Sequence, residues 1–167
     1  MVAADGDAKA PHPPDVEDLK RLCRALNDLG ARYVVVGGFA VNYYGLTRAT
    51  EDIDLLVDPS PENISAVKRA LSIFEDNAAA ELAEDELERY VVVRVVDEVT
   101  VDLIARIGDV TFQNAGRVWA VLDGVRIPIA DLDTLIATKQ SVREKDRLDL
   151  AFLIRVREAE RGFELGE

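Results

Sequence analysis

Two aspartates separated by one residue are the feature of this sequence best suited to chemistry. Asp52 and Asp54 flank Ile53 in the stretch from Asp52 to Val57, whose apolar residues predict a strand. Side chains alternate between the two faces of a strand, so both carboxylates share one face. Their Cα atoms then lie about 6.5 Å apart, where like charges repel unless a cation neutralises them. The spacing predicts a site for Mg²⁺, with Mn²⁺ as the alternative ion.

A third carboxylate comes from another apolar stretch. Asp102 is the one acidic residue between Thr100 and Ile104, a stretch that also predicts a strand. Three acids carried by strands are compatible with a two-metal site. Asp97 and Asp109 lie nearby in the sequence, and placement within a strand is what favours Asp102 over them.

A pair of glycines precedes the acids. Gly37-Gly38 follows the β-branched run from Tyr33 to Val36 and opens a stretch, up to Gly45, that is compatible with a short helix. Backbone without side chains can approach phosphate closely, and the start of a helix favours negative charge, although a plain turn would use the same glycines. The pattern is neither GxGxxG nor GxxxxGK[ST], which argues against a dinucleotide-binding fold and a Walker-type NTPase.

Several other side chains lie where they can meet a nucleotide. Arg48 and Thr50 come just before the paired acids, where Arg48 either binds a phosphate or supports Asp54. Three aromatic residues either stack on a base or belong to the core or its rim: Tyr43, Tyr44 and Trp119.

Two lysines interrupt apolar helix faces near the end of the chain. Lys139 occupies the centre of an apolar stripe formed by Leu132, Leu135 and Ile136. A lysine that faces inward needs an anionic partner, which is either a phosphate or a buried acid. On the next predicted helix Lys145 falls between Phe152 and Val156, and its partner is either a phosphate or Asp149.

Periodicity and turn signals predict the elements that position these residues. Helices are predicted from Pro14 to Leu29, from Ser60-Pro61 onward, and from about Asp131 and Glu144; strands are predicted at Tyr33 to Val36, Asp52 to Val57, Tyr90 to Val96, Val99 to Ile104, Val118 to Leu122 and Val125 to Ile129. Asp97-Glu98 and Asp123-Gly124 predict hairpin turns. The acidic stretch from Glu81 to Glu88 predicts a helix or a solvated loop. This order predicts an α+β fold, a mixed and largely antiparallel sheet with flanking helices.

The composition is that of a soluble globular protein and excludes several kinds of chemistry. With 167 residues, 49% hydrophobic and 31% charged, we expect a flexible leader over residues 1–13 and a single domain over residues 14–167. The net charge of −12 disfavours avid binding to free nucleic acid. A single cysteine, Cys23, excludes an intramolecular disulfide, and a single histidine, His12, excludes multi-histidine metal sites. No stretch suits a signal peptide or a membrane span, so a cytoplasmic protein is expected.

The stretch from Val36 to Leu55 resembles a known enzyme family. Its order of Gly37-Gly38, a spacer from Phe39 to Glu51, and Asp52-Ile53-Asp54 is similar to the signature of the polymerase-β-type nucleotidyltransferase superfamily. The spacer of 13 residues is longer than in the polymerase pattern. The Arg-x-Thr-x-Asp-x-Asp form, with a later lysine-rich helix, resembles the small bacterial branch of toxin-type nucleotidyltransferases, AbiEii-like or minimal.

The resemblance implies a nucleotidyltransferase-like fold and a reaction. A nucleoside monophosphate would move from an NTP onto an acceptor hydroxyl of RNA, a protein or a small alcohol, with release of pyrophosphate. Asp52, Asp54 and Asp102 would be the catalytic and metal-binding residues, with Asp102 activating the acceptor; Gly37, Gly38, Arg48, Thr50, Lys139 and Lys145 would be the nucleotide-binding residues. The alternative is a non-catalytic nucleotide-binding partner module of a toxin–antitoxin pair, and a cognate partner protein is expected in that setting. Three intact carboxylates favour catalysis.

Overall fold

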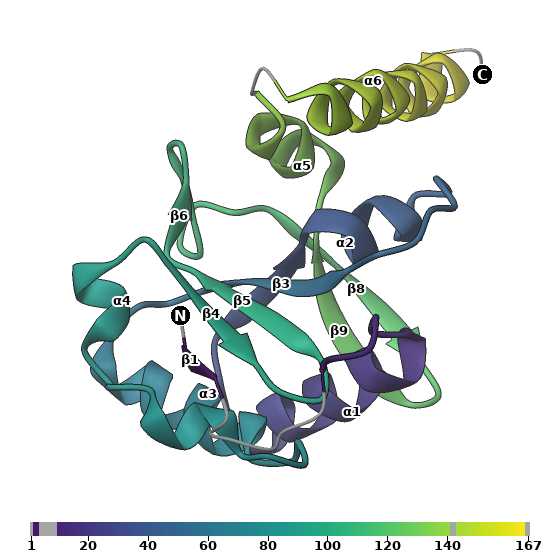
Figure 1. The fold of residues 1–167 in the computed structure, drawn as a ribbon. Coiled ribbons are helices and arrows are strands. Elements are labelled where there is room, and N and C mark those ends of the chain that lie inside the picture. Colours follow the sequence, from purple (N-terminus) through teal and green to yellow (C-terminus); the bar gives the residue numbers. More distant parts are fainter. Residues whose placement is uncertain (1, 4–9, 141–142, 166–167) are drawn as a thin grey trace.

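The computed structural model describes residues 2–3, 10–140 and 143–165, and Figure 1 shows their arrangement. A central sheet separates a lower layer of helices from an upper group that includes the two C-terminal helices. The parts of the expected leader at residues 1 and 4–9 lie outside the described residues. In the described part of the leader, the backbone N–H of His12 donates to the backbone carbonyl of Glu98 at 3.0 Å, so this part of the leader contacts the domain.

Seven strands of the described residues form one mixed sheet, in the order β1-β4-β5-β3-β2-β9-β8. They are β1 (Val2–Ala3), β2 (Tyr33–Val36), β3 (Asp52–Val57), β4 (Val92–Val96), β5 (Thr100–Ile104), β8 (Arg117–Leu122) and β9 (Val125–Ala130). The β1–β4, β3–β5 and β2–β9 pairs are parallel, and the β2–β3, β4–β5 and β8–β9 pairs are antiparallel. The antiparallel pairs contain most of the paired residues, so the expected α+β fold with a mixed, largely antiparallel sheet is confirmed.

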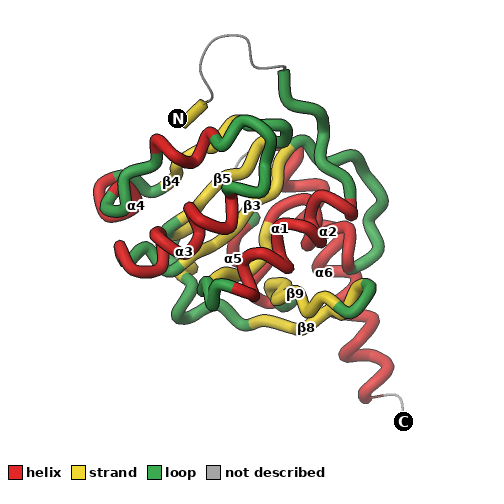
Figure 2. The backbone as a smooth tube through the Cα atoms, turned by 90° about the horizontal axis from the view of Figure 1, so that it is seen from below, coloured by secondary structure: helices red, strands yellow, loops and turns green. Residues whose placement is uncertain are grey.

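The helices fall into two groups around this sheet. Seen from below, α1 (Val16–Asp28) and α3 (Pro61–Leu71) cover one face of it (Figure 2). The helices α2 (Gly37–Tyr43), α5 (Leu132–Thr138) and α6 (Glu144–Leu165) lie toward the other side (Figure 1). The helix α2 packs on β3, and α5 packs on both α2 and α6. The C-terminal helices therefore lie above the strands that carry the paired acids.

Local sequence signals set the ends of the helices in the lower layer. Asp15 and Asp18 form a reciprocal capping box at the start of α1, and Gly30, at φ 67°, follows its end. The Ser60 side chain accepts the N–H of Asn63 at the start of α3, where proline occupies the first turn. The helix predicted from Pro14 to Leu29 by its apolar spacing and the helix predicted from Ser60-Pro61 onward are both confirmed, and the capping box at Asp15 is added by the structure.

Alternation along β3 divides its two faces as the sequence predicts. Ile53, Leu55 and Val57 are fully buried in the core, whereas Asp52 and Asp54 are partly exposed. The apolar face stabilises the sheet against the lower layer of helices. The opposite face can therefore present carboxylates without leaving them enclosed in a dry core.

The hairpin between β4 and β5 differs from the prediction by one residue. Asp97-Glu98 was expected to form a two-residue turn, but the connection spans residues 97–99, and Val96 pairs with Thr100. The Asp97 carboxylate accepts the N–H groups of Asp76, Ala78 and Glu98, and its own N–H donates to the carbonyl of Val99. These bonds hold a tight loop in place of the shorter turn and shift the register of the whole hairpin.

Several short elements were not predicted as such. Two single-turn helices overlap the ends of the acidic stretch, η1 (Ala78–Glu81) and α4 (Glu86–Arg89). A small hairpin of β6 (Arg106–Ile107) and β7 (Val110–Thr111) follows β5. The strand β1 lies within the expected leader. Among the described helices, none combines the length and the apolar character needed to cross a membrane.

Candidate active site

Three aspartates meet on the face of the sheet opposite the layer formed by α1 and α3. The strands β3 and β5 run parallel, with Asp54 directly opposite Asp102 and Asp52 opposite Thr100. A carboxylate oxygen from each of Asp52, Asp54 and Asp102 lies within 4.8 Å of the others. Parallel pairing brings together acids that are about 50 residues apart in sequence, and the alternation of side chains turns all three the same way.

The close acids perturb one another's protonation. Burial, followed by the charges of Asp102 and Asp52, raises the pKa of Asp54 to about 7. Burial and the charge of Asp102 also raise the pKa of Asp52, although Arg94 and Lys145 oppose that shift. A cation bound here would relieve the repulsion among the three carboxylates.

The two glycines permit a very close approach between α2 and β3. Gly37 has a φ of 69°, and a Cβ atom there would overlap the carboxylate of Asp54. A Cβ atom on Gly38 would collide with the side chain of Thr50. Glycine is therefore needed at both positions, and the backbone at the start of α2 lies directly against the acid cluster.

Arg94 also belongs to the site, although no motif in the sequence marks it. On β4 it lies opposite Asp102, and its Nε and Nη2 atoms donate to the two oxygens of Asp102 at 2.9 and 3.0 Å. Its Nη2 atom also donates to Asp52 at 3.2 Å. Hydrogen bonding to Asp102 and that acid's charge raise the pKa of Arg94. The shorter predicted turn would have placed Arg94 opposite Val101, so only the observed register reveals this contact.

The lysine of the predicted apolar stripe lies among buried acids. Lys139 directly follows α5, and its Nζ atom is 3.1 Å from Asp149 and 3.4 Å from Asp146. Both aspartates belong to α6 and are almost fully buried. Arg143 contacts Asp146 at 2.8 Å. The acid predicted as a partner of Lys145 thus pairs with Lys139, and this cluster fastens α6 to α5.

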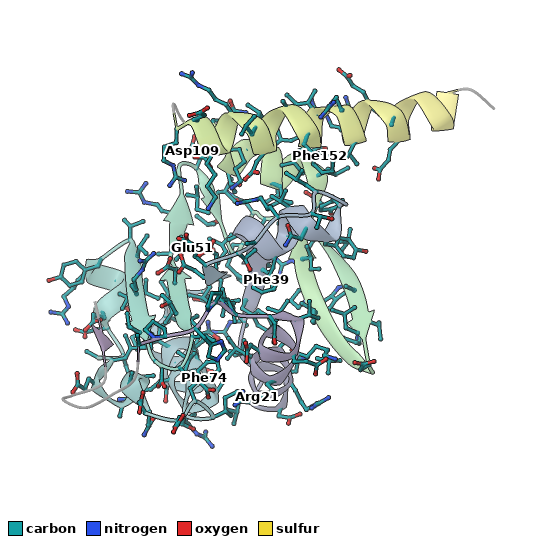
Figure 3. The ribbon with its side chains drawn as sticks, turned by 45° about the vertical axis from the view of Figure 1, so that its right-hand side comes forward. Arg21, Phe39, Glu51, Phe74, Asp109 and Phe152 are labelled. Atoms are coloured by element: carbon teal, nitrogen blue, oxygen red, sulfur yellow. The ribbon has the colours of Figure 1, made fainter. Side chains whose placement is uncertain are left out.

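Arg48 links the loop before β3 to the same cluster. Its Nη2 atom donates to Asp149 at 2.8 Å, so the acid that it supports is Asp149 rather than Asp54. Lys145 is exposed, and its charge acts on Asp52. Arg48 and Lys145 line a cavity of about 510 Å³ between this loop and α6, whose apolar wall includes Leu46, Leu148 and Phe152. In Figure 3 the Phe152 side chain projects from α6 toward α2.

The remaining acidic and aromatic candidates are not part of the three-acid cluster. The Asp97 carboxylate accepts backbone N–H groups from Asp76 and Ala78, in the segment after α3, and from Glu98 in its own loop. Asp109 belongs to the turn between β6 and β7, so Asp102 is the third acid of the cluster. Tyr43 and Tyr44 line a different cavity beside the start of α5. Trp119 is exposed on β8 with the Arg126 guanidinium 4.6 Å from its ring centre.

The donor set of the cluster suits a hard divalent cation. Carboxylate oxygens are the ligands that Mg²⁺ and Mn²⁺ favour, and three of them converge here. The raised pKa of Asp54 provides a second reason, because a bound cation would stabilise its ionised form. The residues present therefore fit the metal that the sequence predicted.

Two solved structures are similar to this chain in fold. A nucleotidyltransferase-like antigenic protein from Paracoccidioides brasiliensis is 18% identical, with a TM-score of 0.56 over 87% of this chain and 79% of that chain. The lincosamide antibiotic adenylyltransferase LnuA, in a lincomycin-bound structure, is 14% identical, with a TM-score of 0.55 over 87% of this chain and 99% of that chain. These similarities show a nucleotidyltransferase-like fold.

The family comparison covers most of the chain. No curated protein matches the sequence. The family described as nucleotidyl transferase AbiEii toxin of type IV toxin–antitoxin systems matches residues 20–163, which include all three acids, both glycines and the C-terminal lysines. The expected resemblance to polymerase-β-type nucleotidyltransferases is confirmed, and the chain belongs to the AbiEii nucleotidyl transferase toxin family.

Proposed function

We propose that this protein is a divalent-metal-dependent enzyme that transfers a nucleoside monophosphate from an NTP onto an acceptor hydroxyl and releases pyrophosphate. The observation that carries the proposal is the convergence of Asp52, Asp54 and Asp102 within 4.8 Å, against the glycine backbone of α2. A protein that only bound nucleotide would not require a third carboxylate at this point. Membership of a nucleotidyl transferase family supports the same reaction class.

The three acids have distinct roles in this proposal. Asp52 and Asp54 would hold Mg²⁺ together with the phosphates, and Asp102 would complete the metal site and orient the acceptor hydroxyl. When bound, the metal neutralises phosphate charge and lowers the pKa of the attacking hydroxyl. In-line attack of that hydroxyl on the α-phosphate forms the new phosphoester bond. The bond between the α- and β-phosphates breaks, and pyrophosphate leaves.

The nucleotide would lie between the acid cluster and the start of α6. Gly37 and Gly38 present bare backbone next to Asp54, where a triphosphate would meet the metal. Lys145 is exposed near Asp52 and would contact the phosphates. Arg48 and Lys139 share Asp149, so they would shape this border of the site through their shared ion pairs.

A labelling experiment tests the reaction and identifies the acceptor. The protein is incubated with Mg²⁺, a cell extract and each NTP in turn, radiolabelled either at the α-phosphate or at the γ-phosphate. We expect the α-label to enter an RNA, a protein or a small alcohol, and the γ-label to appear in pyrophosphate. Asp54→Asn and Asp102→Asn are the matched controls and should abolish transfer. Transfer of the γ-label, or transfer that persists in both variants, would contradict the proposal.

The family also suggests a partner. Because the family description places its members in type IV toxin–antitoxin systems, we propose that a cognate antitoxin counteracts this activity. Restoration of growth on co-expression of a candidate antitoxin, with unchanged levels of the toxin, tests this expectation.

A further inference from the structure

Arg94 makes the most extensive polar contacts with the acid cluster among the described basic residues. Its guanidinium group bonds both oxygens of Asp102 and one oxygen of Asp52, all at 2.9 to 3.2 Å. The Arg94 side chain is 48% exposed, whereas the Asp102 side chain is only 11% exposed. The arginine therefore approaches the buried carboxylate from the solvent side of β4.

The geometry of this contact fixes an orientation as well as supplying a charge. A guanidinium group is planar and presents its donors in a rigid fork, which matches the two oxygens of a carboxylate. A two-point contact holds the plane of the Asp102 carboxylate, whereas a single ammonium would leave it free to rotate. Each carboxylate oxygen has more than one acceptor position, so Asp102 can still offer an oxygen toward Asp52 and Asp54.

The cross-strand position makes the contact intrinsic to the sheet. Arg94 and Asp102 are directly paired in the antiparallel register of β4 and β5, and Asp102 is directly paired with Asp54 in the parallel register of β5 and β3. The three side chains thus form a row across three neighbouring strands. The backbone ladder fixes their relative positions, and the three-residue loop between β4 and β5 sets the register of that ladder.

We propose that Arg94 is a positioning residue of the metal site, which holds the Asp102 carboxylate in the orientation that a divalent cation requires. This inference rests on the proposed function, since the same three acids would bind the metal. Partners that orient a metal ligand typically contribute ten- to a hundredfold to metal affinity. Arg94 acts through Asp102 and does not itself contact the metal.

The test compares charge with geometry at one position. Mn²⁺ binding to the full-length protein without nucleotide is titrated by electron paramagnetic resonance for wild type, Arg94→Lys and Arg94→Met. The number of waters on bound Eu³⁺ is obtained from luminescence lifetimes in H₂O and D₂O. Arg94→Lys conserves the charge and removes the fork, so we expect about tenfold weaker Mn²⁺ binding and about one additional water on Eu³⁺. Asp102→Asn should show the same gain in waters, and the double variant with Arg94→Lys should show no further gain.

Arg21→Met is the matched control. Arg21 is 43% exposed and forms ion pairs with Asp18 and Glu98, and Figure 3 shows it beside Phe74 at the base of the molecule, away from Glu51. Arg21→Met removes an arginine of similar exposure and leaves the contacts of the acid cluster unchanged. We expect unchanged Mn²⁺ affinity and an unchanged number of waters, with thermal melting confirming that every variant is folded.

Three outcomes would overturn the inference. Equal affinity and equal hydration in wild type and Arg94→Lys would show that charge alone matters. Tighter Mn²⁺ binding by Arg94→Met than by wild type would show that Arg94 competes with the metal. If Asp102→Asn also leaves both quantities unchanged, the acid cluster is not the metal site, and the proposed function fails together with this inference.

Discussion

Replacing Asp54 with asparagine is expected to stabilise the metal-free protein at neutral pH. Burial and the neighbouring acids raise the pKa of Asp54 to about 7 in the folded protein, against 3.8 when unperturbed. Between these two values the folded state holds a proton that the unfolded state has released. The contribution of Asp54 to stability is therefore fully present below pH 4 and is lost as the pH rises through 7.

The size of this effect follows from the same shift. A change from 3.8 to about 7 corresponds to at most about 4 kcal/mol, because each pKa unit equals about 1.4 kcal/mol. Partial exposure of Asp54 to solvent reduces that limit. We expect Asp54→Asn to exceed wild type in unfolding free energy by a few kcal/mol near pH 8, and the difference to shrink toward zero near pH 4. Urea denaturation with a chelator present, at several pH values, measures it.

A second acid of the same chain segment provides a control of opposite sign. Although burial raises the pKa of Asp58, hydrogen bonds from Ser60 and Arg32 hold it below its ordinary value. Asp58→Asn should therefore lose stability at neutral pH, and this loss should diminish in acid. If Asp54→Asn were as destabilising at pH 8 as Asp58→Asn, the carboxylate of Asp54 would be a structural partner and the reasoning from charge repulsion would be wrong.

Three further predictions concern the same region. At about pH 6, Mn²⁺ binding should release nearly one proton per ion, because the pKa of about 7 leaves Asp54 largely protonated before the metal binds. Calorimetry in two buffers of different ionisation enthalpy counts the released protons. A count near zero would contradict the assignment of Asp54 as a metal ligand. Gly37→Ala should lower the unfolding free energy by more than the cost of about 1–2 kcal/mol for a left-handed residue, since its Cβ would also overlap Asp54. Gly108 has a similar φ but open space around it, so in denaturation experiments Gly108→Ala should show the backbone cost alone. Lys139→Met should lower the unfolding free energy by about 3 kcal/mol, because it removes the cation that pairs with the buried Asp146 and Asp149. Substitution of the exposed Lys145 by Met should change the unfolding free energy by less than about 0.5 kcal/mol. An unchanged melting temperature of Lys139→Met together with weak NTP binding would instead support a direct phosphate contact.

Sequence periodicity alone was sufficient to define the central strand of the site. The alternation around Asp52, Ile53 and Asp54 predicted one acidic and one apolar face, and both are observed. The end of α1 at Gly30, the cap of α3 at Ser60 and the hairpin at Asp123-Gly124 were likewise predicted, because each depends on residues within one or two turns of the chain. Asp102 was identified because it was the one acid in its strand.

Only the tertiary structure decided which side chains meet across elements. The contact of Arg94 with Asp102 depends on a loop of three residues between β4 and β5, where the sequence predicted two, and one residue of register changes every cross-strand partner. The choice of Lys139 between a phosphate and a buried acid depends on where α6 docks, which places Asp146 and Asp149 beside it. Alternation and capping are set by neighbours along the chain, whereas register and helix docking are set by packing between distant segments. For that reason the sequence could name the three acids of the site, but the arginine and the buried ion pairs around them required the folded structure.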